Sequence, residues 1–178
     1  MGKKKLWGFP KNFFITMEQA EENLKFCDSY NRLPTLLEMA WRLNGTDWLK
    51  LLGREWTTCD NVGIYIEKLW DTPFGHCFGD GPILEMMDVE DLAAYEALPE
   101  VVTVYRGCYA ANKWGLSWSL SRDVAAKFIT LNKYRQQGQP LLVKALAKKK
   151  DIAAVKLDRE EMEIITRGPK HVSTSFIR

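Results

Sequence analysis

The chain has 178 residues, of which 46% are hydrophobic and 27% are charged, and its net charge is only +2. This length and composition predict a single globular domain and exclude a largely disordered chain. No run approaches the roughly 18 apolar residues of a transmembrane helix, and the small net charge gives no global field for binding polyanions.

Residues 1–98 are predicted to be mainly helical. Thr16 and Gln19 form the capping-box pattern at the start of a first helix, whose apolar face includes Ala20 and Leu24. Four further helices are predicted over about 34–43, 46–56, 60–70 and 89–98, the last of them capped by Asp88.

Two further features of this half receive structural interpretations. Trp56 falls on the apolar face of the third predicted helix and is expected to be a core residue. Residues 72–82 contain three Gly and two Pro and are predicted to be a loop. His76 within it is expected to be a surface group rather than a catalytic base.

Residues 99–178 change to a strand pattern, which together with the helices before it predicts an α+β fold. Ser121 is expected to cap a short helix over 124–131 that buries Val124, Ala125 and Phe128. Alternating or β-branched runs predict six strands, over residues 101–105, 116–120, 141–145, 152–155, 161–165 and 171–177.

The charge is divided between these two parts. Residues 1–98 carry 10 Lys and Arg against 16 Asp and Glu, a net −6, and residues 99–178 carry 15 against 7, a net +8. On charge alone we favour the interpretation that the two parts pack on each other. The alternative is that the basic part holds an anionic ligand, either a phosphate-bearing cofactor or nucleic acid.

Three short motifs in the second part carry candidate chemistry. Arg106 ends a predicted strand, and its planar fork of donors suits a phosphate, while Gly107 would let a ligand approach the backbone. Ser117 and Ser119 share one strand face, with Trp118 on the other. Taken alone, the first motif is better explained as a surface arginine at a turn, and the second as a half-buried strand with a core tryptophan.

The third motif is Glu161-Met162-Glu163. Strand alternation places both carboxylates on one face, where they repel each other unless a cation lies between them. Such a pair is useful for stabilising a positive charge. The alternative is a solvated strand face, and the residues alone leave the two interpretations even.

The order of the three motifs, with an Ala-x-x-Phe helix after the second, resembles the arginine–serine–glutamate class of ADP-ribosyltransferases over about residues 101–166. This class includes bacterial toxins, vertebrate ecto-enzymes and phage enzymes. The resemblance implies a two-sheet β core that binds NAD. It assigns catalytic roles to Arg106, Ser117, Glu161 and Glu163, and cofactor binding to Arg106, Gly107, Ser117, Trp118, Ser119 and Phe128.

By this resemblance, Arg106 holds the NAD phosphates and ribose, and Gly107 grips the nicotinamide carboxamide through its backbone. Ser117 steadies Glu163, which stabilises the oxocarbenium-like transition state at the ribose. Glu161 goes with arginine as the acceptor, so NAD and a protein acceptor are the expected partners. Residues 1–98 match no family motif and would form a helical region packed on the catalytic core of residues 99–178.

Other functions stay open on the sequence. The same residues would serve NAD hydrolysis, and a non-enzymatic module could keep the fold. Nucleic-acid binding through Lys144, Lys156 and residues 148–150 gains no support, because the stacking motifs of RNA-binding sheets are absent.

The setting expected from the sequence is the cytoplasm, or the host cytoplasm if a phage encodes the chain. The basic residues 1–5 precede a stretch too short and broken for a signal peptide. The four cysteines form no CxxC motif, which suits a reducing compartment. No metal site and no membrane contact are expected.

Overall fold

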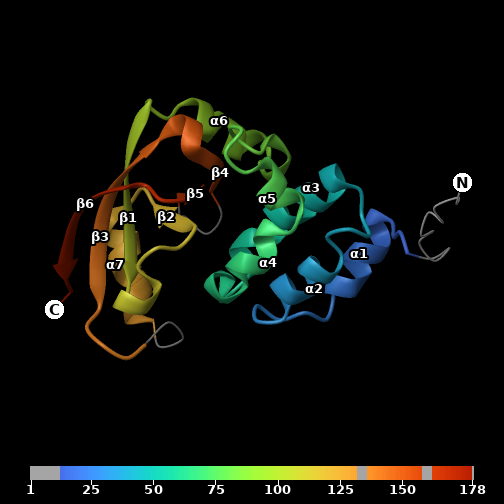
Figure 1. Ribbon diagram of the computed structural model, residues 1–178, viewed down its shortest axis with the longest axis horizontal. Helices are drawn as coiled ribbons and strands as arrows, with labels where there is room; N and C mark the ends of the chain where they lie inside the picture. Colours follow the sequence, from blue (N-terminus) through green and yellow to red (C-terminus); the bar gives the residue numbers. More distant parts are fainter. Residues whose placement is uncertain (1–12, 132–135, 158–161, 178) are drawn as a thin grey trace, which may run out of the picture.

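The computed structural model describes residues 13–131, 136–157 and 162–177 and has the predicted α+β fold. In Figure 1 the helices of the first half lie to one side and the strands of the second half to the other, with α7 against the strands. The α-helices found in the described residues are α1 (Met17–Leu24), α2 (Arg32–Glu38), α3 (Gly45–Glu55), α4 (Ile66–Trp70), α5 (Pro73–Cys77), α6 (Val89–Glu96) and α7 (Arg122–Thr130). The strands are β1 (Val101–Cys108), β2 (Ser117–Ser119), β3 (Leu141–Lys148), β4 (Ile152–Lys156), β5 (Glu163–Thr166) and β6 (Lys170–Phe176).

The helix starts follow the capping residues in the sequence. At α1 the Gln19 N–H donates to Thr16 Oγ1 at 3.2 Å, and the Thr16 N–H donates to Gln19 Oε1 at 2.9 Å, so the predicted capping box is confirmed. Asp88 begins α6 with a second capping box, and Ser121 caps α7 by accepting from the Val124 N–H. These side chains satisfy amide groups that the first turn of a helix leaves without partners.

Two predictions for residues 60–82 are refined by the structure. The single helix predicted over 60–70 is instead a 3₁₀ turn, Val62–Tyr65, followed by the short helix α4. The predicted loop over 72–82 contains α5, because Pro73 suits the first helical turn and Phe74 is fully buried. Tertiary packing of an aromatic side chain thus outweighs the turn-forming composition of this segment.

The strands form one six-stranded antiparallel sheet in the order β4-β5-β2-β1-β3-β6. Among the described residues there is no second sheet, so the expected two-sheet core is corrected to a single sheet. The physical reason lies at its centre, where Tyr105 of β1 pairs with Ser119 of β2 and joins the two halves. This is the one register pair between β1 and β2. On both sides of it the two strands are no longer paired with each other.

Two hydrophobic cores hold the sheet and the helices together. The first unites the helices of residues 17–77 with Leu116, Ala153, Ala154 and Ile165 of the strand region. The second lies around Trp118, Ile164 and Val104 and includes Tyr95 of α6. Neighbouring residues of β5 therefore enter different cores, as strand alternation requires. The helical part is fixed on the sheet by burial of apolar side chains, the dominant favourable term in folding.

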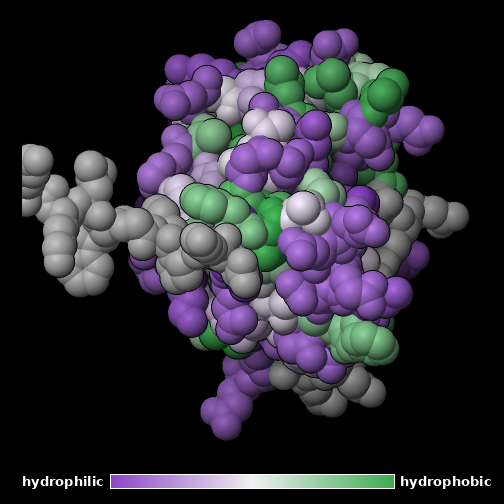
Figure 2. Space-filling model, turned by 90° about the vertical axis from the view of Figure 1, so that its right-hand side faces the viewer, coloured by the Kyte–Doolittle hydropathy of each residue, from purple (hydrophilic) through white to green (hydrophobic). Residues whose placement is uncertain are grey.

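The helical end of the molecule presents a surface of mixed character. Figure 2 views this end and shows hydrophilic side chains in the majority, with hydrophobic ones in smaller patches between them. Within the described ranges, no helix has both the length and the apolar character needed to cross a membrane.

Candidate active site

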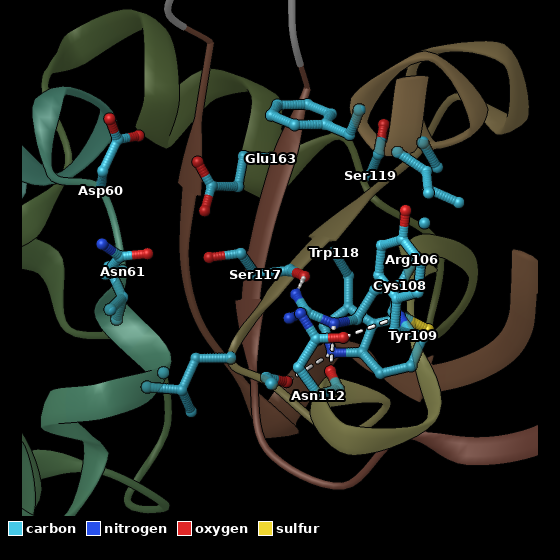
Figure 3. Close-up of a pocket in the computed structure, with 18 of the residues that line it drawn as sticks. Asp60, Asn61, Arg106, Cys108, Tyr109, Asn112, Ser117, Trp118, Ser119 and Glu163 are labelled. Atoms are coloured by element: carbon cyan, nitrogen blue, oxygen red, sulfur yellow. Dashed lines mark hydrogen bonds between the residues drawn. The ribbon is translucent and has the colours of Figure 1, made fainter. Parts of the chain in front are cut away.

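A cavity of about 610 Å³ lies between the helical part and the sheet, a volume typical of small-molecule sites. One wall comes from residues 56–66 of the helical part, and the other from β1, β2, β5 and α7. Figure 3 shows Asp60 and Asn61 on the wall opposite Ser117 and Glu163. The predicted site residues that the structure describes all line this cavity: Arg106, Gly107, Ser117, Trp118, Ser119, Phe128 and Glu163.

Glu163 is held by two neutral donors. The indole Nε1–H of Trp56 donates to Glu163 Oε1 at 2.8 Å, and the Ser117 hydroxyl faces the same carboxylate. Burial raises the pKa of Glu163, while these two donors and the more distant charges of Arg106 and Lys156 lower it, and burial has the larger effect. The carboxylate is thereby oriented without an ion pair in contact with it among the described residues.

The two serines of β2 have different tasks. Ser117 of β2 faces Glu163 of the neighbouring strand β5, and its steadying role stays a prediction. Ser119 stands opposite Glu163 in the β2–β5 register, but its Oγ accepts from the Ser121 N–H at 3.0 Å. Ser119 therefore shapes the turn into α7.

Trp118 is a wall of the cavity and a core residue at once. Its side chain is 2% exposed, packs with Ile164, and donates from Nε1 to the Gly115 carbonyl at 2.9 Å. Strand alternation correctly placed it on the face opposite the serines. In this position the indole supports the cavity from behind.

Arg106 binds the loop that follows β1. Its Nη1 donates to the Ser117 carbonyl and its Nε to the Asn112 carbonyl at 3.3 Å. A Cβ at Gly115 would lie 2.5 Å from Arg106 Nη2, so the glycine lets the loop lie directly against the guanidinium. Burial lowers the pKa of Arg106, although arginine still stays charged. No hydrogen-bond acceptor is found for Nη2 among the described residues.

Gly107 is required by packing. A Cβ here would lie 1.9 Å from the Ala125 carbonyl oxygen of α7, so the glycine allows the helix to lie against β1. Gly107 also lines the cavity, so its role in ligand approach stays a prediction beside this packing role. Continuing the β1–β2 register beyond Tyr105 would pair Gly107 with Ser117, but the strands separate there. The Arg106 guanidinium spans this gap, which forms part of the cavity wall.

Helix α7 completes the wall on the sheet side. Its buried residues are Ala125 and Ile129, whereas Val124 and Phe128 are partly exposed and line the cavity. The prediction that Val124 and Phe128 are buried is therefore corrected. Phe128 lines the cavity, and its contact with a cofactor stays a prediction.

Some cavity residues could not be found from the sequence, and one predicted residue is not described. Trp56 was expected only as a core residue, and Asn61, Tyr109 and Asn112 belong to no motif. Asn112 shapes the loop after β1, because its Oδ1 accepts a hydrogen bond from the Tyr109 N–H at 2.7 Å. Glu161 lies outside the described residues.

The structure assigns other residues to stability. Lys156, one of the lysines considered for nucleic acid, is buried in an ion pair with Asp91, and Lys149 donates to the carbonyls of Glu96 and Leu98. His76 packs edge-on against the Trp41 ring, with centroids 5.4 Å apart, and is not among the cavity residues.

No protein-family model matches this chain, and comparisons with curated proteins and with solved structures also find no match. Conclusions about function therefore depend on the arrangement of the cavity residues themselves.

Proposed function

We propose that the protein is a mono-ADP-ribosyltransferase that cleaves NAD and transfers ADP-ribose to a protein acceptor, with an arginine side chain as the acceptor group. The observation that carries this proposal is the position of Glu163. Its carboxylate lies in a cavity of small-molecule size, is held by Ser117 and Trp56, and is attracted by Arg106. The three motif strands β1, β2 and β5 are neighbours in one sheet.

The chemistry of NAD cleavage fits these groups. As nicotinamide leaves, positive charge develops at the ribose, as in glycoside cleavage. A carboxylate fixed nearby stabilises that charge without having to reorganise, and this is Glu163's role. Nη2 of Arg106 would contact the pyrophosphate, and Phe128 would give an apolar surface to a ring of the substrate.

Acceptor choice is the part of the proposal that rests on Glu161. A guanidinium approaching the ribose carbon is best held by a second carboxylate, which also takes its proton as the new bond forms. Without an acceptor, water attacks instead and the products are ADP-ribose, nicotinamide and a proton. NAD hydrolysis is therefore the second candidate function, favoured by the enclosed position of Glu163.

The test is to incubate the purified protein with labelled NAD, with and without cell lysate, and to follow nicotinamide release and protein labelling. We expect both activities in the wild type and neither in Glu163→Gln. Glu161→Gln should lose labelling but keep nicotinamide release. Release without labelling in the wild type would leave hydrolysis as the function, and no release would overturn the proposal.

Reduced thiols suit the four free cysteines, so we place the reaction in the cytoplasm.

A further inference from the structure

Trp56 connects the helical part of the molecule to Glu163. Its indole Nε1–H reaches Oε1 at 2.8 Å across a sequence separation of 107 residues. We propose that Trp56 is a positioning residue that fixes the Glu163 carboxylate and favours its ionised form, so that the helical part completes the active site. The catalytic meaning of this proposal rests on the proposed function, but the contact itself can be tested without it.

The Trp56 ring is held by other aromatic rings. It is 2% exposed and stacks on Phe74 of α5 with ring centroids 5.9 Å apart, and Phe74 stacks in turn on Trp70 of α4 at 5.7 Å. Such contacts restrict the rotation of the indole, because close-packed interiors leave few voids. The N–H is therefore aimed at Glu163 before any substrate binds.

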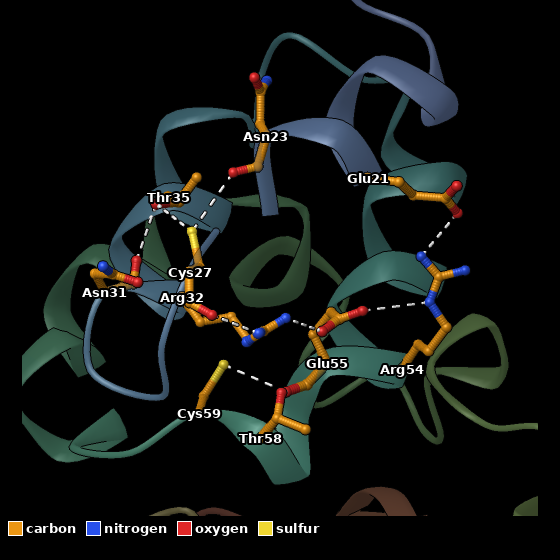
Figure 4. A network of polar contacts seen from close by, with 10 residues as sticks. All are labelled: Glu21, Asn23, Cys27, Asn31, Arg32, Thr35, Arg54, Glu55, Thr58 and Cys59. Atoms are coloured by element: carbon orange, nitrogen blue, oxygen red, sulfur yellow. Dashed lines mark hydrogen bonds and ion pairs between the residues drawn. The ribbon is translucent and has the colours of Figure 1, made fainter. Parts of the chain in front are cut away.

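The turn that carries Trp56 is also fixed by polar contacts, shown in Figure 4. The Glu55 carbonyl accepts from Thr58 Oγ1 at 2.7 Å and from the Cys59 thiol at 3.3 Å, which closes the 3₁₀ turn Trp56–Thr58. Burial raises the pKa of Cys59 to about 12, so its thiol keeps the proton that it donates. The Glu55 carboxylate pairs with Arg32 at 2.7 Å.

An indole N–H suits this task chemically. It can donate but cannot accept, so it favours the ionised carboxylate, and it does not neutralise the negative charge as a lysine would. The other groups acting on Glu163 are Ser117 from β2, Arg106 from β1 and Lys156 from β4. The two cations act from a distance, so the hydrogen bond from Trp56, with the Ser117 hydroxyl beside it, orients the carboxylate.

Trp56→Phe removes the N–H and keeps an aromatic ring on Phe74. Trp48→Phe is the matched control, because the Trp48 indole is also buried in the same region and donates to the Leu36 carbonyl at 2.8 Å, away from the cavity. For Trp56→Phe we expect kcat for nicotinamide release to fall about 10- to 100-fold with a nearly unchanged KM for NAD. The acidic limb of its pH profile should move to higher pH. Trp48→Phe should match the wild-type profile, and equal profiles for the two variants would overturn the proposal.

A second measurement does not depend on activity. In ¹H–¹⁵N spectra the seven tryptophans give indole resonances, and Trp56→Phe identifies the one that belongs to Trp56. We expect this resonance to move with pH as Glu163 ionises, and to stay fixed in Glu163→Gln. If the chemical shift of this resonance does not change with pH in the wild type, the proposal is overturned even if the enzyme is active. A resonance that titrates in a protein unable to cleave NAD supports the contact and rejects the proposed function.

Discussion

Asp91 and Glu163 are two carboxylates near Lys156, and the protein compensates their charges in opposite ways. Asp91 forms a buried ion pair with Lys156 Nζ through Oδ2 and accepts from the Leu157 N–H through Oδ1 at 2.9 Å. Glu163 is contacted by two neutral donors, and Lys156 only attracts it from a distance. The Asp91 carboxylate is neutralised by its ion pair inside the protein, whereas the Glu163 carboxylate faces the cavity without a cation in contact with it among the described residues.

This difference is what we expect between a structural carboxylate and a catalytic one. A buried charge is costly unless it is paired, so the Asp91–Lys156 pair is what a structural carboxylate requires. Glu163 bears part of that cost, which is seen in its raised pKa. Perturbed carboxyl groups in clefts are typical of active sites, where the charge is needed for a ligand or a transition state.

Breaking the Asp91–Lys156 ion pair should have the largest effect on stability. Asp91→Ala leaves the Lys156 ammonium buried without its partner and removes the capping box of α6. We expect the free energy of unfolding to fall by about 3–5 kcal/mol, measured by denaturant titration. The matched control is Asp123→Ala at the first turn of α7, where the side chain is 85% exposed and its ion pair with Arg122 spans 3.8 Å. A loss for Asp91→Ala as small as that of the control would contradict the structural role.

Removing the negative charge of Glu163, the carboxylate that faces the cavity, should lower the activity. Glu163→Gln keeps the shape and the acceptor oxygen but removes the negative charge. We expect nicotinamide release to fall about 100- to 1,000-fold, the usual effect of removing one preorganised electrostatic group. The circular dichroism spectrum should match the wild type. Substantial release by a folded variant would remove Glu163 from the chemistry.

The third prediction concerns the distant cation Arg106. Arg106→Ala removes its attraction for phosphate, and we expect the dissociation constant for NAD measured by calorimetry to rise about 10- to 100-fold. Arg106→Lys keeps the charge but loses the planar fork that joins the Asn112 and Ser117 carbonyls. Its affinity should lie between those of the wild type and Arg106→Ala. Unchanged affinity in both variants would limit Arg106 to holding the loop.

The sheet side of the cavity could be predicted from the sequence, whereas the helical side could not. Strand alternation is a local rule, so the shared face of Ser117 and Ser119 and the opposite face of Trp118 follow from their spacing. Trp56 follows an amphipathic helix, where a tryptophan indicates core and its hydrogen-bond partner is set by packing 107 residues away. The single sheet likewise depends on one pair, Tyr105 with Ser119, which no local pattern specifies.

The smallest expected effect, and the sharpest contrast between the two carboxylates, is the stability of Glu163→Gln as a function of pH. Burial raises the pKa of Glu163 in the folded protein, whereas the unfolded chain has the ordinary glutamate pKa of about 4.3. Between these two values the folded state binds the proton more tightly, so the stability contributed by this group is present at low pH and falls as the pH rises.

Gln does not titrate and avoids this loss. Glu163→Gln should therefore melt at a higher temperature than the wild type at neutral pH, and the difference should shrink as the pH falls toward 4, whereas Asp91→Ala should melt at a lower temperature throughout. Melting curves of the three proteins from pH 4 to 8 measure this, and a Glu163→Gln variant less stable than the wild type at neutral pH would mean that the folded protein stabilises this negative charge.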